Sequence, residues 1–137
     1  MRTPECVFCK IVERNAEALI IHEDDHTISF LPLEPAVAGH TVLVPKAHYV
    51  DVYSIPEELL GAVMSSCKTH ALRWREQLGA TGINVLHASG AAAEQSVGHF
   101  HLHLFPRFAD DGLSTWPALP PPAQTREAMH AAFRLAR

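Results

Sequence analysis

The segment GHFHLHLFPR, residues 98–107, places three histidines at alternate positions with Phe and Leu between them. Alternate residues of a β-strand point to the same face of a sheet, with their Cα atoms about 6.6–7 Å apart. In a helix, residues two apart are rotated by about 200°, so three imidazoles could not share one site. The segment therefore predicts a strand with His99, His101 and His103 on one face and apolar side chains on the other.

The histidine face allows three interpretations from the residues alone. It could be a half-exposed strand that carries histidines by chance, or a metal site, because H-x-H on a strand can chelate zinc. It could also act on phosphorus, because imidazole is a nucleophile and a proton carrier near neutral pH. The preceding residues, Gln95-Ser96-Val97-Gly98, favour the last, because a loop of small residues lets backbone N–H groups approach an anion.

Length and composition predict one globular domain. The chain has 137 residues, of which 47% are hydrophobic and 19% charged. The net charge of −4 argues against binding to a nucleic-acid polymer, which needs clustered Lys and Arg. No apolar run approaches the roughly 18 residues of a membrane span, and MRTPECVFCKIV does not resemble a signal peptide. A cytoplasmic protein without membrane partners is expected.

The order of predicted elements indicates an α+β fold, a mostly antiparallel sheet with one long helix packed on it. Ser54 and Glu57 have the spacing of a capping box at the start of that helix, and Gly79 is expected to end it. Residues 1–110 are expected to form the domain, and 111–137 a proline-rich extension with a short helix packed on it. The predicted elements are a short helix within 8–15, a hairpin of 18–23 and 26–31, strand 40–45, helix 56–78, and strands 82–89 and 99–108.

Cysteine usage adds a second candidate site. Cys6 and Cys9 form a C-x-x-C pair, whereas Cys67 lies on a helix face and is expected to be a buried small hydrophobe. In a reducing compartment such a pair is more often a metal site or a redox motif than a structural disulfide. A reduced pair without a ligand is the third alternative.

The segment Q-S-V-G-H-F-H-L-H-L-F resembles the signature of the histidine-triad (HIT) superfamily. The segment G-H-T-V-L-V-P-K-A-H, residues 39–48, and the opening C-V-F-C-K-I-V resemble the family in the same order. The resemblance covers about residues 5–108 and implies a HIT-like fold.

The resemblance also implies roles for individual residues. His101 corresponds to the nucleophile that attacks the α-phosphorus and becomes transiently nucleotidylated, and His103 to the histidine that supports the phosphate. His40 corresponds to a histidine that contacts the nucleophile, and Ser96 to a hydroxyl near the leaving group. The implied nucleotide-binding residues are Gln95, which bridges phosphate, Val97, and an apolar pocket of Val7, Phe8, Ile11, Phe30 and Leu33. No catalytic metal is required, because a neutral imidazole can attack phosphorus and leave again.

A subset of the superfamily holds a zinc ion with two cysteines of a C-x-x-C and two histidines. The resemblance therefore implies a zinc site made by Cys6, Cys9, His48 and His99. Two thiolates and two imidazoles complete a tetrahedron, so this Zn²⁺ would be structural.

The chain departs from the family pattern at three positions. Pro32 stands where an Asp for the ribose hydroxyls is usual, His87 replaces an Asn, and Glu94 replaces a Gly. These departures put tight nucleotide binding in doubt more than they affect the chemistry. Trp116-Pro117 resembles a C-terminal Trp-Pro that reaches the substrate at the dimer edge in some relatives; a simple packed tail is the alternative.

The expected function is therefore hydrolysis or transfer at the α-phosphate of nucleoside phosphoramidates or related nucleotides. Two rivals share the same residues, a dinucleoside polyphosphate hydrolase and a non-catalytic nucleotide-binding or scaffold protein. A pure metalloenzyme ranks last, because it gives His101 and Gln95-Ser96 no role. The family also implies a homodimer, for which the helix over 56–78 is a suitable contact.

Overall fold

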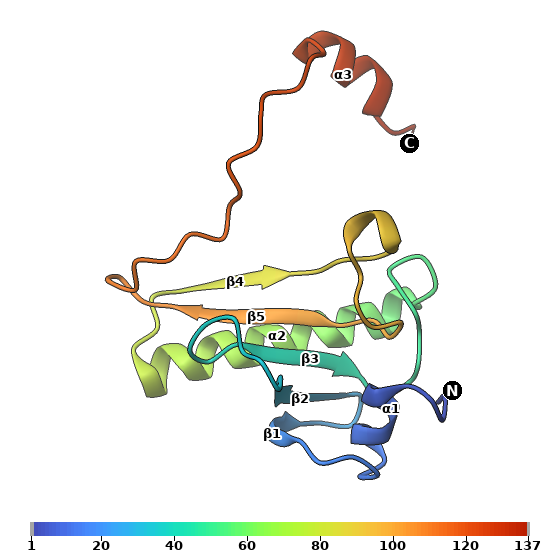
Figure 1. The fold of residues 1–137 in the computed structure, drawn as a ribbon, viewed down its shortest axis with the longest axis vertical. Helices are drawn as coiled ribbons and strands as arrows, with labels where there is room; N and C mark the ends of the chain where they lie inside the picture. Colours follow the sequence, from blue (N-terminus) through green and yellow to red (C-terminus); the bar gives the residue numbers. More distant parts are fainter. Residues whose placement is uncertain (1, 137) are drawn as a thin grey trace.

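The computed structural model describes residues 2–136 and contains a five-stranded antiparallel sheet with the order β1-β2-β3-β5-β4 (Figure 1). This architecture confirms the predicted α+β class. The elements are α1 (Val7–Val12), β1 (Leu19–Glu23), β2 (Thr27–Leu31), β3 (Thr41–Pro45), α2 (Glu57–Leu78), β4 (Gly82–Leu86), a 3₁₀ turn (Ala91–Ala93), β5 (Leu102–Arg107) and α3 (Arg126–Phe133).

The two faces of the sheet pack against different helices. Leu102 and Leu104 of β5 join Val63 and Trp74 of α2 in one buried apolar cluster. On the opposite face, residues of α1 pack with β2 and β3 in a second cluster. The members of the second cluster are Phe8, Ile11, Ile28, Phe30, Val42 and Val44. The alternation of side chains along β5 therefore directs its apolar residues toward α2, as predicted.

Helix α2 ends as predicted but begins differently. Gly79 adopts a left-handed conformation (φ 70°) just after the last helical residue, which is the usual glycine stop. The predicted capping box is wrong, because Pro56 is the N-cap and no side chain caps the helix. The Ser54 hydroxyl instead donates to the Asp51 carbonyl within the preceding turn (3.3 Å). That local bond competes with capping.

Strands β4 and β5 are both shorter than predicted. The ladder between β3 and β5 has Leu43 opposite Leu102 as its last pair, and β4 ends at Leu86. Before Leu102 the chain bonds to a different partner, since the Phe100 N–H donates to the Tyr49 carbonyl (2.6 Å). The segment from His99 to His101 therefore lies beyond the sheet ladder, at its end.

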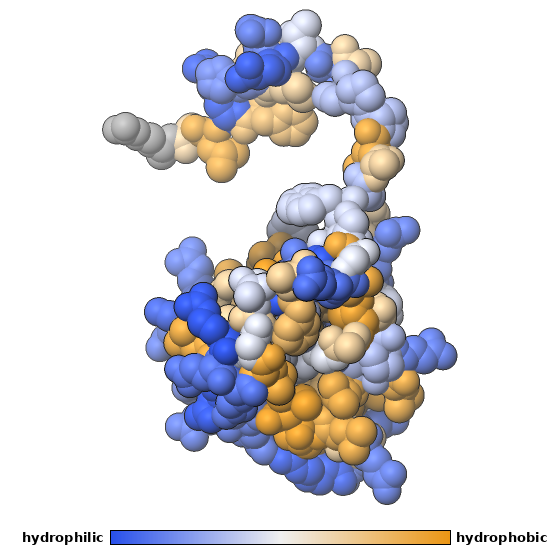
Figure 2. Space-filling view, turned by 90° about the vertical axis from the view of Figure 1, so that its left-hand side faces the viewer, coloured by the Kyte–Doolittle hydropathy of each residue, from blue (hydrophilic) through white to orange (hydrophobic). Residues whose placement is uncertain are grey.

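The C-terminal extension differs from the prediction. A short helix forms at α3, where the Thr125 hydroxyl accepts a hydrogen bond from the Ala128 N–H (3.1 Å). No α3 residue is buried, and the extension arches away from the domain instead of packing on it (Figures 1 and 2). Trp116 is 86% exposed. The connecting segment contains Pro-rich sequence that lacks N–H donors and favours an extended chain. The domain boundary near residue 110 stays a prediction.

Across residues 2–136, none of the helices is both long enough and apolar enough to cross a membrane.

Candidate functional site

The three histidines of the opening segment lie on the α1 side of the sheet. The rings of His99 and His101 meet Phe8 of α1 edge to face, with centroids 5.8 and 5.2 Å apart. His101 and His103 lie side by side, with ring centroids 4.9 Å apart. The alternation therefore predicted the face correctly, although only His103 belongs to the paired part of β5.

The side chains of Cys6, Cys9, His48 and His99 converge, with all four candidate ligand atoms within 4.8 Å of one another. We call this group the metal cluster. Cys9 Sγ lies 3.3 Å from His48 Nδ1, and Cys6 Sγ lies 3.4 Å from His99 Nδ1. The two Nδ1 atoms are 3.1 Å apart. The structure thus brings together all four residues that the resemblance implied.

The donor atoms of the metal cluster fit a tetrahedral ion. A tetrahedral zinc, with bonds of about 2.0 Å to nitrogen and about 2.3 Å to sulfur, holds its ligand atoms about 3.3–3.8 Å apart. His99 Nε2 donates to the Pro45 carbonyl (2.8 Å), which leaves a lone pair on Nδ1 facing the cluster. Burial lowers the pKa of His99 to about 4, so the ring is in its neutral, metal-binding form near neutral pH. The 3.1 Å between the Nδ1 atoms of His48 and His99 is close to the separation of two nitrogen ligands on such an ion.

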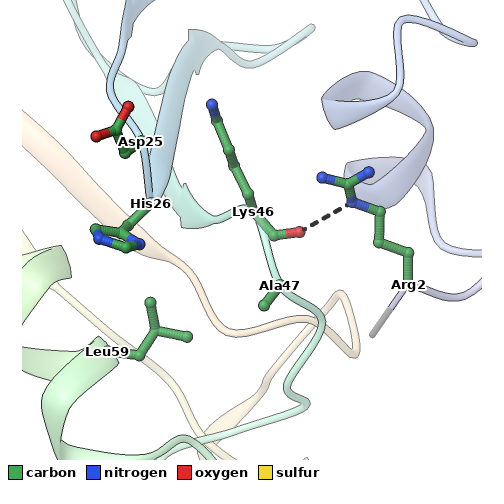
Figure 3. Close-up of a pocket in the computed structure, with 6 residues that line it drawn as sticks. All are labelled: Arg2, Asp25, His26, Lys46, Ala47 and Leu59. Atoms are coloured by element: carbon green, nitrogen blue, oxygen red, sulfur yellow. Dashed lines mark hydrogen bonds between the residues drawn. The ribbon is translucent and has the colours of Figure 1, made fainter.

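Local sequence explains how distant residues reach the metal cluster. The buried side chains of Phe8 and Ile11 anchor α1 on the sheet, which fixes Cys6 and Cys9 at its first turn. His48 follows β3 in a loop that the N-terminal segment also contacts. There the Arg2 Nε donates to the Lys46 carbonyl (3.5 Å, Figure 3).

A pocket of about 530 Å³ lies beside this contact. It opens between the β1–β2 turn, the end of β3 and α2 (Figure 3). Its lining residues are Arg2, Asp25, His26, Lys46, Ala47 and Leu59. None of the predicted site residues lines it, so it is separate from the candidate site.

A second group, which we call the imidazole cluster, comprises His40, His101 and His103. The Ala36 N–H donates to His40 Nδ1 (2.9 Å), so the neutral His40 carries its proton on Nε2 and donates it to His103 Nδ1 (2.9 Å). His103 then carries its own proton on Nε2. His101 Nδ1 donates to the His99 carbonyl (2.7 Å), which leaves the lone pair of His101 on Nε2.

Burial keeps the imidazole cluster uncharged. Desolvation is the largest cause that lowers the pKa of His40 and of His101 below the ordinary histidine value. For His103, burial and then the neighbouring His101 and His40 lower the pKa to about 4. At neutral pH the cluster therefore offers a nucleophilic lone pair beside an N–H donor, without positive charge.

The predicted nucleotide-binding residues are divided between buried and exposed positions. Phe8, Ile11 and Phe30 are buried and pack together, whereas Leu33 is fully exposed on the loop after β2. Val7 is 45% exposed. His101 is also buried, with 4% of the residue exposed. That these residues bind a base stays a prediction.

The loop before the histidines is held by Gln95. The Gly90 N–H donates to Gln95 Oε1 (2.8 Å), and Gln95 Nε2 donates to the carbonyls of Val50 (2.6 Å) and Val97 (3.0 Å). Its amide is therefore hydrogen-bonded within the protein, and the phosphate contact of Gln95 stays a prediction. Ser96 is exposed. Glu94, the residue in place of glycine, adopts the left-handed conformation that glycine favours (φ 65°).

Sequence reasoning noted His87 only as a departure, but the structure places it against the nucleophile candidate. Its Nδ1 donates to the His101 carbonyl (2.8 Å). The signal available in the sequence was its position at the end of the strand that borders the histidine segment.

A cluster of neutral imidazoles at the end of such a sheet is the arrangement of histidine-triad proteins, and the adjacent C-x-x-C metal cluster matches a subset of them, so the chain falls in that class. The family model of the HIT domain matches residues 13–110, so the chain belongs to the HIT family.

Comparisons with individual proteins agree with that assignment. An uncharacterized HIT-like protein of Methanocaldococcus jannaschii is 36% identical over 107 residues, 78% of this chain and 82% of that protein. A zinc-bound histidine triad family protein from Mycobacterium smegmatis, known from a crystal structure, is 39% identical over 81% of each chain, with a TM-score of 0.76. The adenylylsulfatase HINT3 of Arabidopsis thaliana is 33% identical over 109 residues, 80% of this chain and 55% of that protein.

Proposed function

We propose that the protein hydrolyses or transfers nucleoside monophosphate groups, acting at the α-phosphate of nucleoside phosphoramidates or related nucleotides. The observation that carries this proposal is the hydrogen bond from His101 Nδ1–H to the His99 carbonyl. In the neutral ring this bond leaves the lone pair on Nε2. A fixed tautomer of this kind is what an imidazole nucleophile needs.

The reaction would take two displacements. First, His101 Nε2 attacks the α-phosphorus, the bond from phosphorus to the leaving nitrogen breaks, and the departing amine takes a proton. Ser96 is the proposed donor near that group. Second, water attacks the same phosphorus, the bond from phosphorus to His101 Nε2 breaks, and the proton that water loses returns to Ser96, which restores its hydroxyl and a neutral His101. His103 would donate its Nε2–H to a non-bridging oxygen, where negative charge grows in the transition state.

Binding requires contacts that hold base, sugar and phosphate. Phe8, Ile11 and Phe30 are proposed to line the base site, with the exposed Val7 and Leu33 at its rim. Backbone N–H groups at Ser96 and Val97 are proposed to hold the phosphate. Gln95 would either maintain the loop, as its hydrogen bonds support, or turn toward phosphate when substrate binds.

We propose that Zn²⁺ occupies the metal cluster and stabilises the fold. Cys6, Cys9, His48 and His99 would hold it, and they complete four-coordination without an open position for substrate. The zinc-bound relative supports this proposal. The free thiols of Cys6 and Cys9 fit a reducing compartment such as the cytoplasm.

A turnover assay tests the proposed reaction. The purified protein should hydrolyse adenosine 5′-phosphoramidate faster than diadenosine polyphosphate. The His101→Ala variant is the negative control. Faster turnover of the dinucleotide would favour the polyphosphate hydrolase. Equilibrium binding of adenosine monophosphate without turnover of either compound would favour the non-catalytic nucleotide-binding protein and overturn the proposed reaction.

A homodimer is also part of the proposal. Met64, Leu72 and Leu78 of α2 are 43–59% exposed, which leaves apolar surface on that helix for a second copy. Light scattering during gel filtration should give twice the chain mass. A monomer at micromolar concentration would contradict the proposed assembly.

A further inference from the structure

We propose that His87 is a positioning residue for His101: its side chain holds the backbone of the nucleophile beyond the end of the sheet. The effect of His87 on catalysis rests on the proposed function, whereas the contacts that His87 makes do not depend on it.

Both ring nitrogens of His87 are engaged in defined roles. Nδ1 donates to the His101 carbonyl (2.8 Å), which fixes the proton on that nitrogen. Nε2 then accepts a hydrogen bond from the Ser89 hydroxyl. The ring also lies over Phe100, with centroids 4.4 Å apart and planes 30° apart. Although His87 is an exposed residue, its ring therefore has one orientation.

The sheet explains why His101 needs this contact. The ladder between β4 and β5 ends with Leu86 opposite His103, so no backbone group of β4 pairs with His101. The His87 side chain extends the bonding of β4 by one more step, because it supplies a donor where the ladder has stopped. The peptide of His101 is thereby fixed to β4.

The orientation of the His101 ring depends on this peptide. The ring is bound to its own backbone through Nδ1 and the His99 carbonyl (2.7 Å). The His101 ring is bonded to the His99 carbonyl, but the direction of its Nε2 also depends on the backbone of His101. That backbone must therefore be fixed as well. The two hydrogen bonds, one from His101 Nδ1 and one to the His101 carbonyl, therefore set the direction of Nε2 together.

Ser89 connects His87 to a second segment of the site. The Val52 N–H donates to the Ser89 hydroxyl oxygen (2.9 Å). The same segment accepts from Gln95 at the Val50 carbonyl and from Phe100 at the Tyr49 carbonyl. His87 is thus one member of a set of contacts that tie residues 49–52 to the chain around His101.

Three substitutions separate the possible contributions of His87. His87→Asn keeps a donor at the place of Nδ1, His87→Phe keeps only the ring over Phe100, and His87→Gln places its amide near the position of Nε2. His130→Asn, on the exposed face of α3, is the matched control for a change of imidazole to amide.

Steady-state kinetics with adenosine 5′-phosphoramidate gives the first readout. We expect His87→Phe and His87→Gln to lower kcat at least about tenfold with KM changed less than about twofold, since a small misplacement of a reacting group is costly. His87→Asn should recover kcat to within about threefold of wild type, and thermal unfolding should show that every variant is folded at the assay temperature. Wild-type kcat in His87→Phe, or no recovery in His87→Asn, would overturn the proposal.

Nitrogen NMR of the His101 ring gives a readout that does not need turnover. The wild-type ring should show one tautomer, with the proton on Nδ1, and His87→Phe should shift it toward a mixture while His87→Asn preserves it. Unchanged His101 signals in His87→Phe would contradict the positioning role. Should the wild type lack turnover, the proposed function fails while this spectrum still decides the role of His87.

Discussion

The metal cluster and the imidazole cluster meet at His99 and His101, two histidines separated by a single phenylalanine. His99 donates through Nε2 to the Pro45 carbonyl and presents Nδ1, whereas His101 donates through Nδ1 to the His99 carbonyl and presents Nε2. The residue type is the same, but in each ring the nitrogen that donates to a backbone carbonyl carries the proton. The other nitrogen therefore keeps the lone pair. This difference suits His99 to the proposed metal and His101 to the proposed reaction.

The partners of each lone pair complete the distinction. Nδ1 of His99 faces two thiols and another imidazole nitrogen, a set that binds a soft cation. The ring of His101 has His103 beside it and, within residues 2–136, no carboxylate among its hydrogen-bond partners. These surroundings are the reason to propose a stabilising metal in the metal cluster and the reaction in the imidazole cluster.

Substituting His101 with Ala should have the largest effect and should act on the imidazole cluster alone. We expect turnover of adenosine 5′-phosphoramidate to fall about 10⁴-fold or more, because the nucleophile is removed. Zinc content, measured by atomic emission, should match wild type, and thermal unfolding should show that the variant is folded at the assay temperature. Loss of zinc in this variant would show that the two clusters are not separable.

Substituting Cys9 with Ser should act first on the metal cluster. Cys9 is buried, and loss of its thiolate should abolish stoichiometric zinc and lower the free energy of unfolding by more than about 4 kcal/mol. Denaturant unfolding with and without a chelator measures the effect. Cys67→Ser is the control for zinc content, because Cys67 belongs to α2 and packs in its apolar cluster, away from the proposed ligands. Equal zinc content in Cys9→Ser and wild type would contradict the assignment.

Acid should destabilise the fold through the imidazole cluster. The pKa of His103 is about 4, below the ordinary value of 6.5, so between these values the unfolded chain binds more protons than the native protein. This contribution is fully present above pH 6.5 and is lost as pH falls through 4, with an upper limit of about 3 kcal/mol. Unfolding curves at several pH values should show a smaller loss in His103→Asn. An identical pH dependence in that variant would place the acid sensitivity in the metal cluster instead.

Substituting Glu94 with Gly should have the smallest effect and should not change either cluster. Glu94 has φ 65°, so glycine should relieve strain and raise the free energy of unfolding by about 1 kcal/mol. Thermal unfolding measures the gain. Ala93→Gly is the matched control and should destabilise instead, because Ala93 lies in the 3₁₀ turn without a positive φ. Destabilisation by Glu94→Gly would show that the carboxylate contributes a contact.

Local rules in the sequence predicted the elements and the shared face of the three histidines. Alternation placed the three histidines on one face, and Gly79 marked the end of α2. The grouping of Cys6 and Cys9 with His48 and His99 came from the family resemblance, since spacing alone cannot join residues about 90 positions apart.

The contacts made by loops could not be predicted. The Gln95 amide is used to hold its own loop, and His87 reaches the His101 carbonyl only because β4 stops at Leu86. The position of α3 also depends on proline-rich chain between it and the domain, for which no periodic pattern exists. Such contacts depend on the residue at which two strands stop pairing. The pattern of apolar and polar side chains in the sequence does not predict that residue.

The most direct test is to locate the nucleotide on the protein during turnover. Wild-type protein is mixed with excess adenosine 5′-phosphoramidate, quenched in alkali, which preserves phosphorus–nitrogen bonds of histidine, and digested for peptide mass spectrometry. An adenylyl group on His101, absent from the His101→Ala sample, is the predicted result. Product formation with the adenylyl group on another residue, or with none on any peptide in a single turnover, would contradict nucleophilic attack by His101.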